Sequence, residues 1–238
     1  MLDLDVIWVV GCAGLVLLMQ PGFMCLEAGL TRSKNSINVA IKNLIDIGLS
    51  ICFFWCFGYA LMFGASQLGW IGTSGWLLNV ENNPEQAAFF LFQMMFCGTA
   101  TTIVSGALAE RLKFQGYLAI ASLISGIIYP IYGHWVWNGA DTGPVTGWLG
   151  NLGFVDFAGA TAVHSVGGWV SLAALLVVGA RRDRLPTGRT PQTGLRRRRS
   201  PLVRKIHGSN LPLSVLGAML LWVGWLGFNG GSTFALDE

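Results

Sequence analysis

The stretch DFAGATAVHSVGGWVSLAALLVVGARR, residues 156–182, is a run of small and apolar residues interrupted by a few polar ones. An aspartate opens it, a histidine follows eight residues later, and two arginines close it. The apolar run has the ~20 residues that a helix needs to span a hydrocarbon layer of ~30 Å. The stretch therefore predicts a membrane helix with Asp156 at one end and His164 in its interior.

The rest of the chain has the same character. Of its 238 residues 53% are hydrophobic and only 11% are charged, whereas soluble domains have about 25% charged residues. Helices satisfy their own backbone groups in lipid, and small residues let them pack closely. We therefore predict an all-α membrane protein, a single transmembrane domain over residues 1–238. Its helices are expected at 6–26, 44–63, 88–109, 117–137, 157–180 and 211–231.

The distribution of positive charge predicts how these helices are oriented. All fifteen Lys and Arg residues follow the first, third and fifth predicted helices, and the other loops have none. Loops rich in Lys and Arg stay in the cytoplasm. We therefore expect a multi-pass protein of the plasma or inner membrane, with the amino terminus outside. The basic residues are Arg32, Lys34 and Lys42, then Arg111 and Lys113, and ten between Arg181 and Lys205.

Other functional classes find little support. The basic segment 181–205 has prolines but no apolar periodicity, so it is predicted to be a flexible cytoplasmic loop that attracts anionic lipid rather than nucleic acid. All five cysteines lie inside predicted helices, which argues against a disulfide framework. The sequence has no phosphate loop and no dinucleotide fingerprint. We expect no cofactor, no metal site and no enzyme activity.

Several acidic residues near the helix ends are most simply structural. Glu27 and Asp46 lie close in sequence to basic residues, and Glu110 precedes Arg111. Ionisable residues inside membrane helices are energetically costly, so they are usually functional unless they lie close to a helix end. We interpret these three carboxylates as interfacial ion pairs and caps.

Asp156 and His164 each have either a structural or a functional role. Asp156 can cap the free N–H groups at the start of its helix, where the helix dipole favours a negative charge. His164 lies about 12 Å deeper at 1.5 Å per residue, near the middle of the membrane. It is either a core residue or a functional one, since both ring nitrogens need partners in lipid. Ala160, Gly167 and Gly168 share its face and would allow a neighbouring helix to approach closely.

Aromatic residues near the same end carry a second pattern. Trp137 ends the fourth predicted helix, Phe96 lies in the third, and Phe228 and Ser232 share a face of the sixth. Aromatic rings near a membrane surface commonly form an interfacial belt. Their faces also bind cations, with ~0.5–2 kcal/mol and more when water is excluded. The pattern leaves both roles open for Trp137.

Four longer stretches together resemble one known family. They are LVLLMQPGFMCLEAGLTRSKN (15–35), IVSGALAERLKF (103–114), DFAGATAVHSVGG (156–168) and LLWVGWLGFNGGS (220–232). Through them the chain closely resembles the ammonium transporter family (Amt/Mep, with the Rh proteins as relatives), over nearly its whole length. The segment 138–155 is longer than the family pattern leads us to expect.

The resemblance implies roles for individual residues. Trp137 and Ser232 would recruit ammonium at the outer vestibule, with Asp156 supporting the site through structure and charge. Phe96 and Phe228 would form a stacked gate below it. His164 would be one of two pore histidines that share a hydrogen bond. The cation would release its proton, because carrying it intact through an apolar bore is costly, and ammonia would pass while the histidines relay the proton.

The resemblance also implies a homotrimer and allows a cytoplasmic regulatory protein as partner. Family members have about eleven helices in two inverted halves, so this chain is expected to be the part with six of them. One alternative is an ammonium sensor joined to a signalling domain. A haem-bearing oxidoreductase with His134 and His164 as ligands is a weaker one, because their predicted depths differ.

Overall fold

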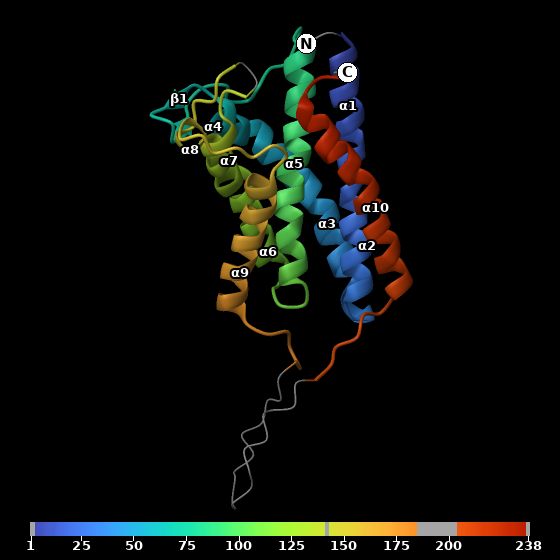
Figure 1. The fold of residues 1–238 in the computed structure, drawn as a ribbon. Helices are drawn as coiled ribbons and strands as arrows, with labels where there is room; N and C mark the ends of the chain where they lie inside the picture. Colours follow the sequence, from blue (N-terminus) through green and yellow to red (C-terminus); the bar gives the residue numbers. More distant parts are fainter. Residues whose placement is uncertain (1–2, 141–142, 185–203, 237–238) are drawn as a thin grey trace, which may run out of the picture.

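The computed structural model describes residues 3–140, 143–184 and 204–236. Within these residues six helices are long and apolar enough to cross a membrane, which confirms the predicted number (Figure 1). The described chain begins and ends at the same end of the bundle, where the Leu236 backbone N–H donates to Asp5 at 3.1 Å. We call this the N-terminal end, and the opposite one the basic end. The spans are Asp3–Leu30, Ser33–Phe63, Pro84–Leu108, Phe114–Trp137, Ala160–Val178 and Leu211–Thr233.

The first span consists of α1 (Asp3–Leu17) and α2 (Met19–Leu30), which meet at Leu18. Pro21 explains the break, because proline lacks the N–H that would bond to the preceding turn and its ring crowds that turn. The Leu18 N–H is shared between the carbonyls of Gly14 and Leu15, at 3.2 and 3.1 Å. The span therefore continues as one unit with a local distortion.

The second and fourth spans each contain a π-helical turn at the place where they meet. The second runs through α3 (Ser33–Phe53), η1 (Phe54–Gly58) and α4 (Tyr59–Phe63), and the fourth through α6 (Phe114–Leu123), η2 (Ile124–Ile128) and α7 (Tyr129–Trp137). A Cβ on Gly126 would lie 2.5 Å from the Phe57 ring. Only glycine allows this close packing of the two widened turns.

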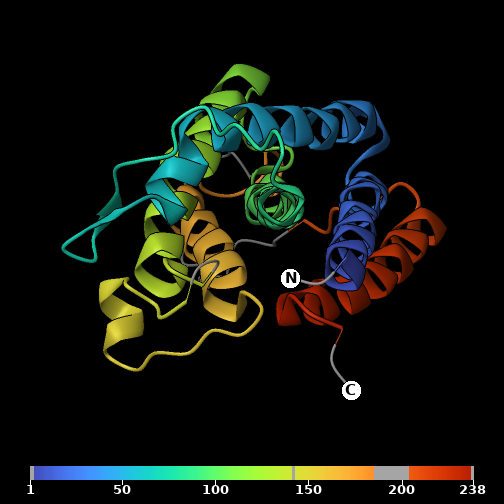
Figure 2. The same cartoon turned by 90° about the horizontal axis from the view of Figure 1, so that it is seen from above.

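The third span, α5 (Pro84–Leu108), is the centre of the bundle. Seen from above, α3 lies on one side of it, and α9 (Val166–Val178) and α10 (Leu211–Gly230) lie on the other (Figure 2). Asn83 caps α5 by accepting from the Gln86 N–H at 3.0 Å, and Pro84 occupies its first turn. Most of its side chains are buried, so nearly every other helix packs against it.

Short elements cover the N-terminal end. The strands β1 (Ser66–Gln67) and β2 (Ile71–Gly72) pair antiparallel, with Ser66 opposite Gly72, and α8 (Trp148–Asn151) lies in the loop that follows α7. The π-helical turn η3 (Ala160–Ser165) leads into α9, and η4 (Gly231–Thr233) follows α10. These elements hold the loops that carry the candidate site.

Two of the three carboxylate interpretations are wrong. Helix α3 begins at Ser33, eleven residues before the predicted start at 44, so the polar segment that looked like a loop is helical. Asp46 is buried where α3 packs on α6, and it accepts from the Tyr117 hydroxyl at 2.5 Å. Glu27 accepts from Asn43 and Ser105. Both carboxylates are buried by neighbouring helices and bonded to neutral groups, not paired at an interface.

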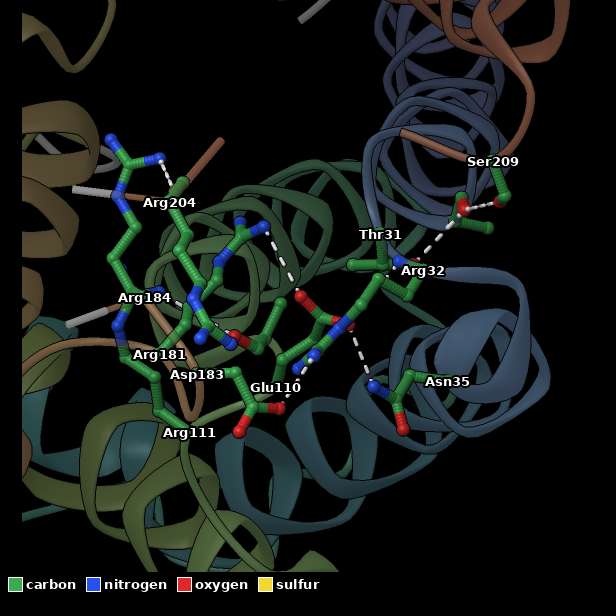
Figure 3. A network of polar contacts seen from close by, with 12 residues as sticks. Thr31, Arg32, Asn35, Glu110, Arg111, Arg181, Asp183, Arg184, Arg204 and Ser209 are labelled. Atoms are coloured by element: carbon green, nitrogen blue, oxygen red, sulfur yellow. Dashed lines mark hydrogen bonds and ion pairs between the residues drawn. The ribbon is translucent and has the colours of Figure 1, made fainter. Parts of the chain in front are cut away.

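The interpretation of Glu110 as an ion-pair residue is confirmed. Its buried carboxylate contacts the Arg32 guanidinium at 2.8 Å and that of Arg181 at 3.2 Å, and Asn35 donates to it at 2.7 Å (Figure 3). Burial alone would raise the pKa of Glu110, but these hydrogen bonds outweigh it and hold the pKa below the usual range. The network ties three loops together at the basic end. Most of the predicted flexible loop 181–205 lies outside the described residues.

Candidate functional site

A cavity of about 250 Å³ lies at the N-terminal end of the bundle. It brings together four of the residues predicted from the sequence, from four different spans and their loops. Apolar side chains form most of its wall. The lining residues are Gln93, Phe96, Val136, Trp137, Ala140, Val145, Phe154, Val155, Asp156, Phe157, Ser232 and Phe234.

Trp137 and Asp156 meet directly, although 18 residues separate them in the sequence. The indole Nε1 of Trp137 donates to the carbonyl oxygen of Asp156 at 2.6 Å. The loop between them folds back because the Asn138 side chain donates to the carbonyls of Met62 and Gly64, at 2.9 and 3.0 Å. Trp137 is buried, with 9% of its surface exposed. The belt interpretation of this residue is therefore wrong.

Asp156 caps the start of the fifth span, as predicted. One carboxylate oxygen accepts from the N–H groups of Gly159 and Ala160, at 2.7 and 3.0 Å. The other accepts from the Thr161 N–H and hydroxyl and from the Ala162 N–H, at 2.8, 2.5 and 2.8 Å. Five donors occupy the lone pairs that a carboxylate offers. The group contributes negative charge to the cavity without an oxygen free to bind a ligand directly.

The charge of Asp156 is retained by these bonds. Burial alone would raise its pKa, but the hydrogen bonds from Thr161, Ala162 and Gly159 outweigh burial, and the pKa lies below its ordinary value. Gly159 has φ 91°, a left-handed conformation that lets the backbone turn its N–H toward the carboxylate. The carboxylate therefore stays ionised behind the wall of the cavity.

The rings of Phe96 and Phe228 stack beside the cavity, on the side of the basic end. Their centroids are 3.9 Å apart and their planes differ by 8°. Both rings are almost fully buried. The Ser232 hydroxyl donates to the carbonyl of Phe228 at 2.9 Å, so its lone pairs remain available as acceptors. The stacked pair separates the cavity from the interior of the bundle.

His164 lies on the far side of this pair. Its ring stacks on Trp225 with centroids 4.9 Å apart, and its centroid lies 5.4 Å from that of Phe228. Neither ring nitrogen is hydrogen-bonded to any residue that the structure describes. The π-helical turn aims the ring, since the His164 N–H bonds to Gly159 five residues back, at 3.0 Å.

A neighbouring helix was predicted to approach closely at Gly167 and Gly168, next to His164. The structure shows this approach at Gly167 but not at Gly168. A Cβ on Gly167 would lie 2.8 Å from Ile103 of α5, so the two helices touch there. Gly168 has no atom within 4 Å of such a Cβ. Neighbouring positions of an α-helix point about 100° apart, so only Gly167 faces α5.

The residues missed from the sequence include one polar and two aromatic side chains. Gln93 lines the cavity, and its side-chain oxygen is buried without a hydrogen-bond partner among the described residues. Phe234 lines the same cavity, and Trp225 stacks on His164. Helical spacing carried a usable signal, because Gln93 precedes Phe96 and Trp225 precedes Phe228 by one turn each.

The geometry of His134 argues against haem ligation. Its Nδ1 lies 2.9 Å from the Met62 carbonyl and its Nε2 lies 2.9 Å from the Ser66 hydroxyl, so both nitrogens are occupied. Among the described residues, no group of three or more His, Cys, Asp or Glu side chains could hold a metal ion. His134 instead fastens the second span to the fourth.

The sequence and fold were compared with known proteins. The model of the Ammonium Transporter Family matches residues 7–238. The protein sll0537 of Synechocystis sp. is 60% identical over 241 residues, covering 99% of this chain and 42% of that protein. Ammonium transporter Amt2 of Archaeoglobus fulgidus is 41% identical, with 100% of this chain and 49% of that protein covered.

A solved structure described as a Sensor Amt Protein gives a TM-score of 0.88 at 42% identity, covering 99% of this chain and 56% of that one. The structure of Mep2 from Candida albicans gives a TM-score of 0.79 at 28% identity, covering 98% of this chain and 49% of that one. The chain thus spans about half the length of the relatives that it matches.

Proposed function

This chain belongs to the ammonium transporter family, and on that premise we propose that it supplies the recruitment site, the gate and one pore histidine of a protein that moves ammonium or ammonia across a membrane. The single observation that carries the proposal is the order of groups along α5. A cavity with aromatic and hydroxyl walls comes first, a stacked phenylalanine pair follows, and a histidine lies beyond it.

The chemistry of the cavity fits ammonium. The cation has four N–H donors, and the Gln93 side-chain oxygen is a buried acceptor that lacks a partner among the described residues. The Ser232 hydroxyl offers lone pairs, and the Trp137 ring offers a π face. The charge of Asp156 favours a cation through space, since its oxygens are already occupied.

Passage beyond the cavity favours the neutral species. In this proposal the route continues past the apolar Phe96 and Phe228 rings, where an intact cation would be costly. Release of the proton leaves ammonia, which is small and neutral. His164, with no bonded partner in the described chain, can hydrogen-bond ammonia and relay the proton. The second histidine of the family pattern would come from the other half of a complete transporter, and three such subunits would form the trimer.

We expect the basic end to face the cytoplasm and the cavity to face outside, in a plasma or inner membrane. In a background without native cysteines, Ser74→Cys should react with a membrane-impermeant maleimide on whole cells. Thr190→Cys, which lies outside the described residues, should react only with a permeant reagent. The reverse pattern of labelling would refute this orientation.

A chimera tests the function itself. Residues 1–238 would be joined to the remaining part of sll0537 and expressed in a strain that lacks ammonium transporters. We expect the chimera to restore growth on low ammonium, and residues 1–238 alone to insert but restore nothing. Rescue by residues 1–238 alone would contradict the requirement for a second half, and no rescue by a well-expressed chimera would contradict the transport function.

A Trp137→Leu substitution in that chimera should weaken recruitment. Loss of the ring face is expected to raise the ammonium concentration for half-maximal transport by roughly 5–30-fold, with a smaller effect on the maximal rate. Trp76→Leu serves as the control, because that indole is exposed at the same end but does not line the cavity. Equal effects of the two substitutions would remove Trp137 from the site.

The sensor role is the second candidate, favoured by the similarity to the structure described as a Sensor Amt Protein. A sensor could bind ammonium at the same cavity with little flux. Ammonium-evoked currents in proteoliposomes that contain the chimera distinguish the two roles. Saturable binding without a current would favour the sensor.

A further inference from the structure

A second cavity, of about 300 Å³, lies at the basic end between α2 and α5. Phe23, Glu27 and Thr31 line it at intervals of four residues along and just beyond α2, and Ile103 and Ala107 line it from α5. The wall is apolar except for the Glu27 carboxylate, the Thr31 hydroxyl and the Arg181 guanidinium. It therefore combines an aromatic ring, a hydroxyl, a carboxyl group and a guanidinium around one small space.

The Glu27 carboxylate is buried yet not fully partnered. One oxygen accepts from the Asn43 amide at 3.0 Å and from the Ser105 hydroxyl at 2.9 Å. The other oxygen accepts no hydrogen bond from any described residue, and only 7% of the residue surface is exposed. Gly106 makes room for it, because a Cβ there would lie 3.1 Å from this oxygen. A buried carboxylate needs a compensating partner.

The nearby basic side chains do not bond to Glu27. Lys42 lies 5.0 Å above the Tyr117 ring, whose hydroxyl donates to Asp46, and it acts on Glu27 through space without a hydrogen bond or ion pair. Arg181 also lines the cavity, and its guanidinium pairs with Glu110 at 3.2 Å. Among the described residues no basic group forms an ion pair with Glu27. One oxygen of Glu27 is therefore left without a hydrogen-bond partner among the described residues, at a residue that lines the cavity.

The two cavities lie along one face of α5. Gln93 and Phe96 line the first, Ile103 and Ala107 line the second, and Ala100 lies between them. These positions are three or four residues apart, the spacing of one helix face. From Phe96 to Ile103 the rise is about 10 Å at 1.5 Å per residue. The second cavity therefore lies further toward the basic end along the same face of α5, past the point where Gly167 of α9 packs on Ala100 and Ile103.

We propose that Glu27 and Thr31 form an inner site for ammonium at the cytoplasmic end of the proposed route. The free Glu27 oxygen accepts from the cation in a charge-assisted bond, and the Phe23 ring contributes its π face. The Thr31 hydroxyl donates its hydrogen to the Ala28 carbonyl at 3.0 Å, so its lone pairs can accept from the cation. This inference rests on the proposed function, since it takes ammonium to be what travels along the route.

Infrared difference spectroscopy tests the site without a transport assay. The purified chain in lipid nanodiscs would be titrated with ammonium chloride against N-methyl-D-glucamine chloride. We expect a saturable change in a glutamate carboxylate band that Glu27→Gln abolishes. Thr31→Val should raise the half-saturating concentration by about 3–10-fold, as expected for one lost hydrogen bond. An unchanged band in Glu27→Gln would overturn the proposal.

The controls separate this site from the first cavity. Glu27→Gln keeps an amide oxygen for Asn43 and Ser105, so the variant should retain its elution volume and helical content. Glu81→Gln, an exposed carboxylate, and Ser232→Ala, in the first cavity, should leave the band intact. Loss of the band in Ser232→Ala would also overturn the inner site. Failure of the proposed transport function would be detected in a different experiment, because the chimera would then support no growth.

Discussion

Asp156→Ala is expected to destabilise the protein by roughly 3–5 kcal/mol, the range for removal of a buried charged acceptor with several donors. The carboxylate accepts hydrogen bonds from four backbone N–H groups and the Thr161 hydroxyl. Alanine leaves these donors without partners at the start of a membrane helix. It also removes the charge behind the first cavity. Thermal unfolding in detergent and growth of the chimera measure the two effects.

Asp156→Asn separates structure from charge. The amide oxygen can still accept from two of the donors. The unfolding temperature of Asp156→Asn should therefore be closer to that of the unsubstituted chain than the unfolding temperature of Asp156→Ala is. It should nevertheless raise the ammonium concentration for half-maximal transport, because the negative charge is gone. An Asp156→Asn chimera with normal ammonium dependence would show that the residue acts only as a cap.

The same carboxylate predicts how stability depends on pH. Its pKa is lower in the folded chain than its ordinary value of 3.8. The stabilisation is therefore complete above the unfolded pKa and is lost as the pH falls through the folded value. The difference in unfolding temperature between the unsubstituted chain and Asp156→Asn should accordingly shrink below about pH 4.

His164→Ala in the chimera is expected to lower ammonium flux by about 100-fold or more, the usual contribution of a group that transfers a proton. Expression should stay near normal, because the ring makes stacking contacts but no hydrogen bonds with the described residues. Ammonium-evoked currents in proteoliposomes measure the flux. Normal currents would identify His164 as a core residue and remove it from the pathway.

His164→Phe is the matched control. Phenylalanine keeps a ring that can stack on Trp225 and Phe228 but has no nitrogens. If the nitrogens carry the function, His164→Phe should lose flux as severely as His164→Ala. Near-normal flux in His164→Phe would mean that the ring only shapes the path.

The sequence by itself determined the class of the protein. Long apolar segments and the spacing of Lys and Arg predicted six membrane helices, because length and hydrophobicity are local properties. The stretch from Asp156 to His164 was read correctly as a helix start with a capping carboxylate. The motifs at Phe96, Phe228 and Ser232 predicted residues that the fold brings beside one cavity or its stacked wall.

Only the tertiary structure decided which polar groups face each other. Trp137 reaches Asp156 because a loop folds back, and Glu27 and Asp46 are buried because α2, α3, α5 and α6 pack against one another. The π-helical turn η3 shifts the 3.6-residue register and thereby sets the direction of His164. The partner of a buried polar group depends on the rotation and contacts of whole helices, and these are set by residues far apart in the chain.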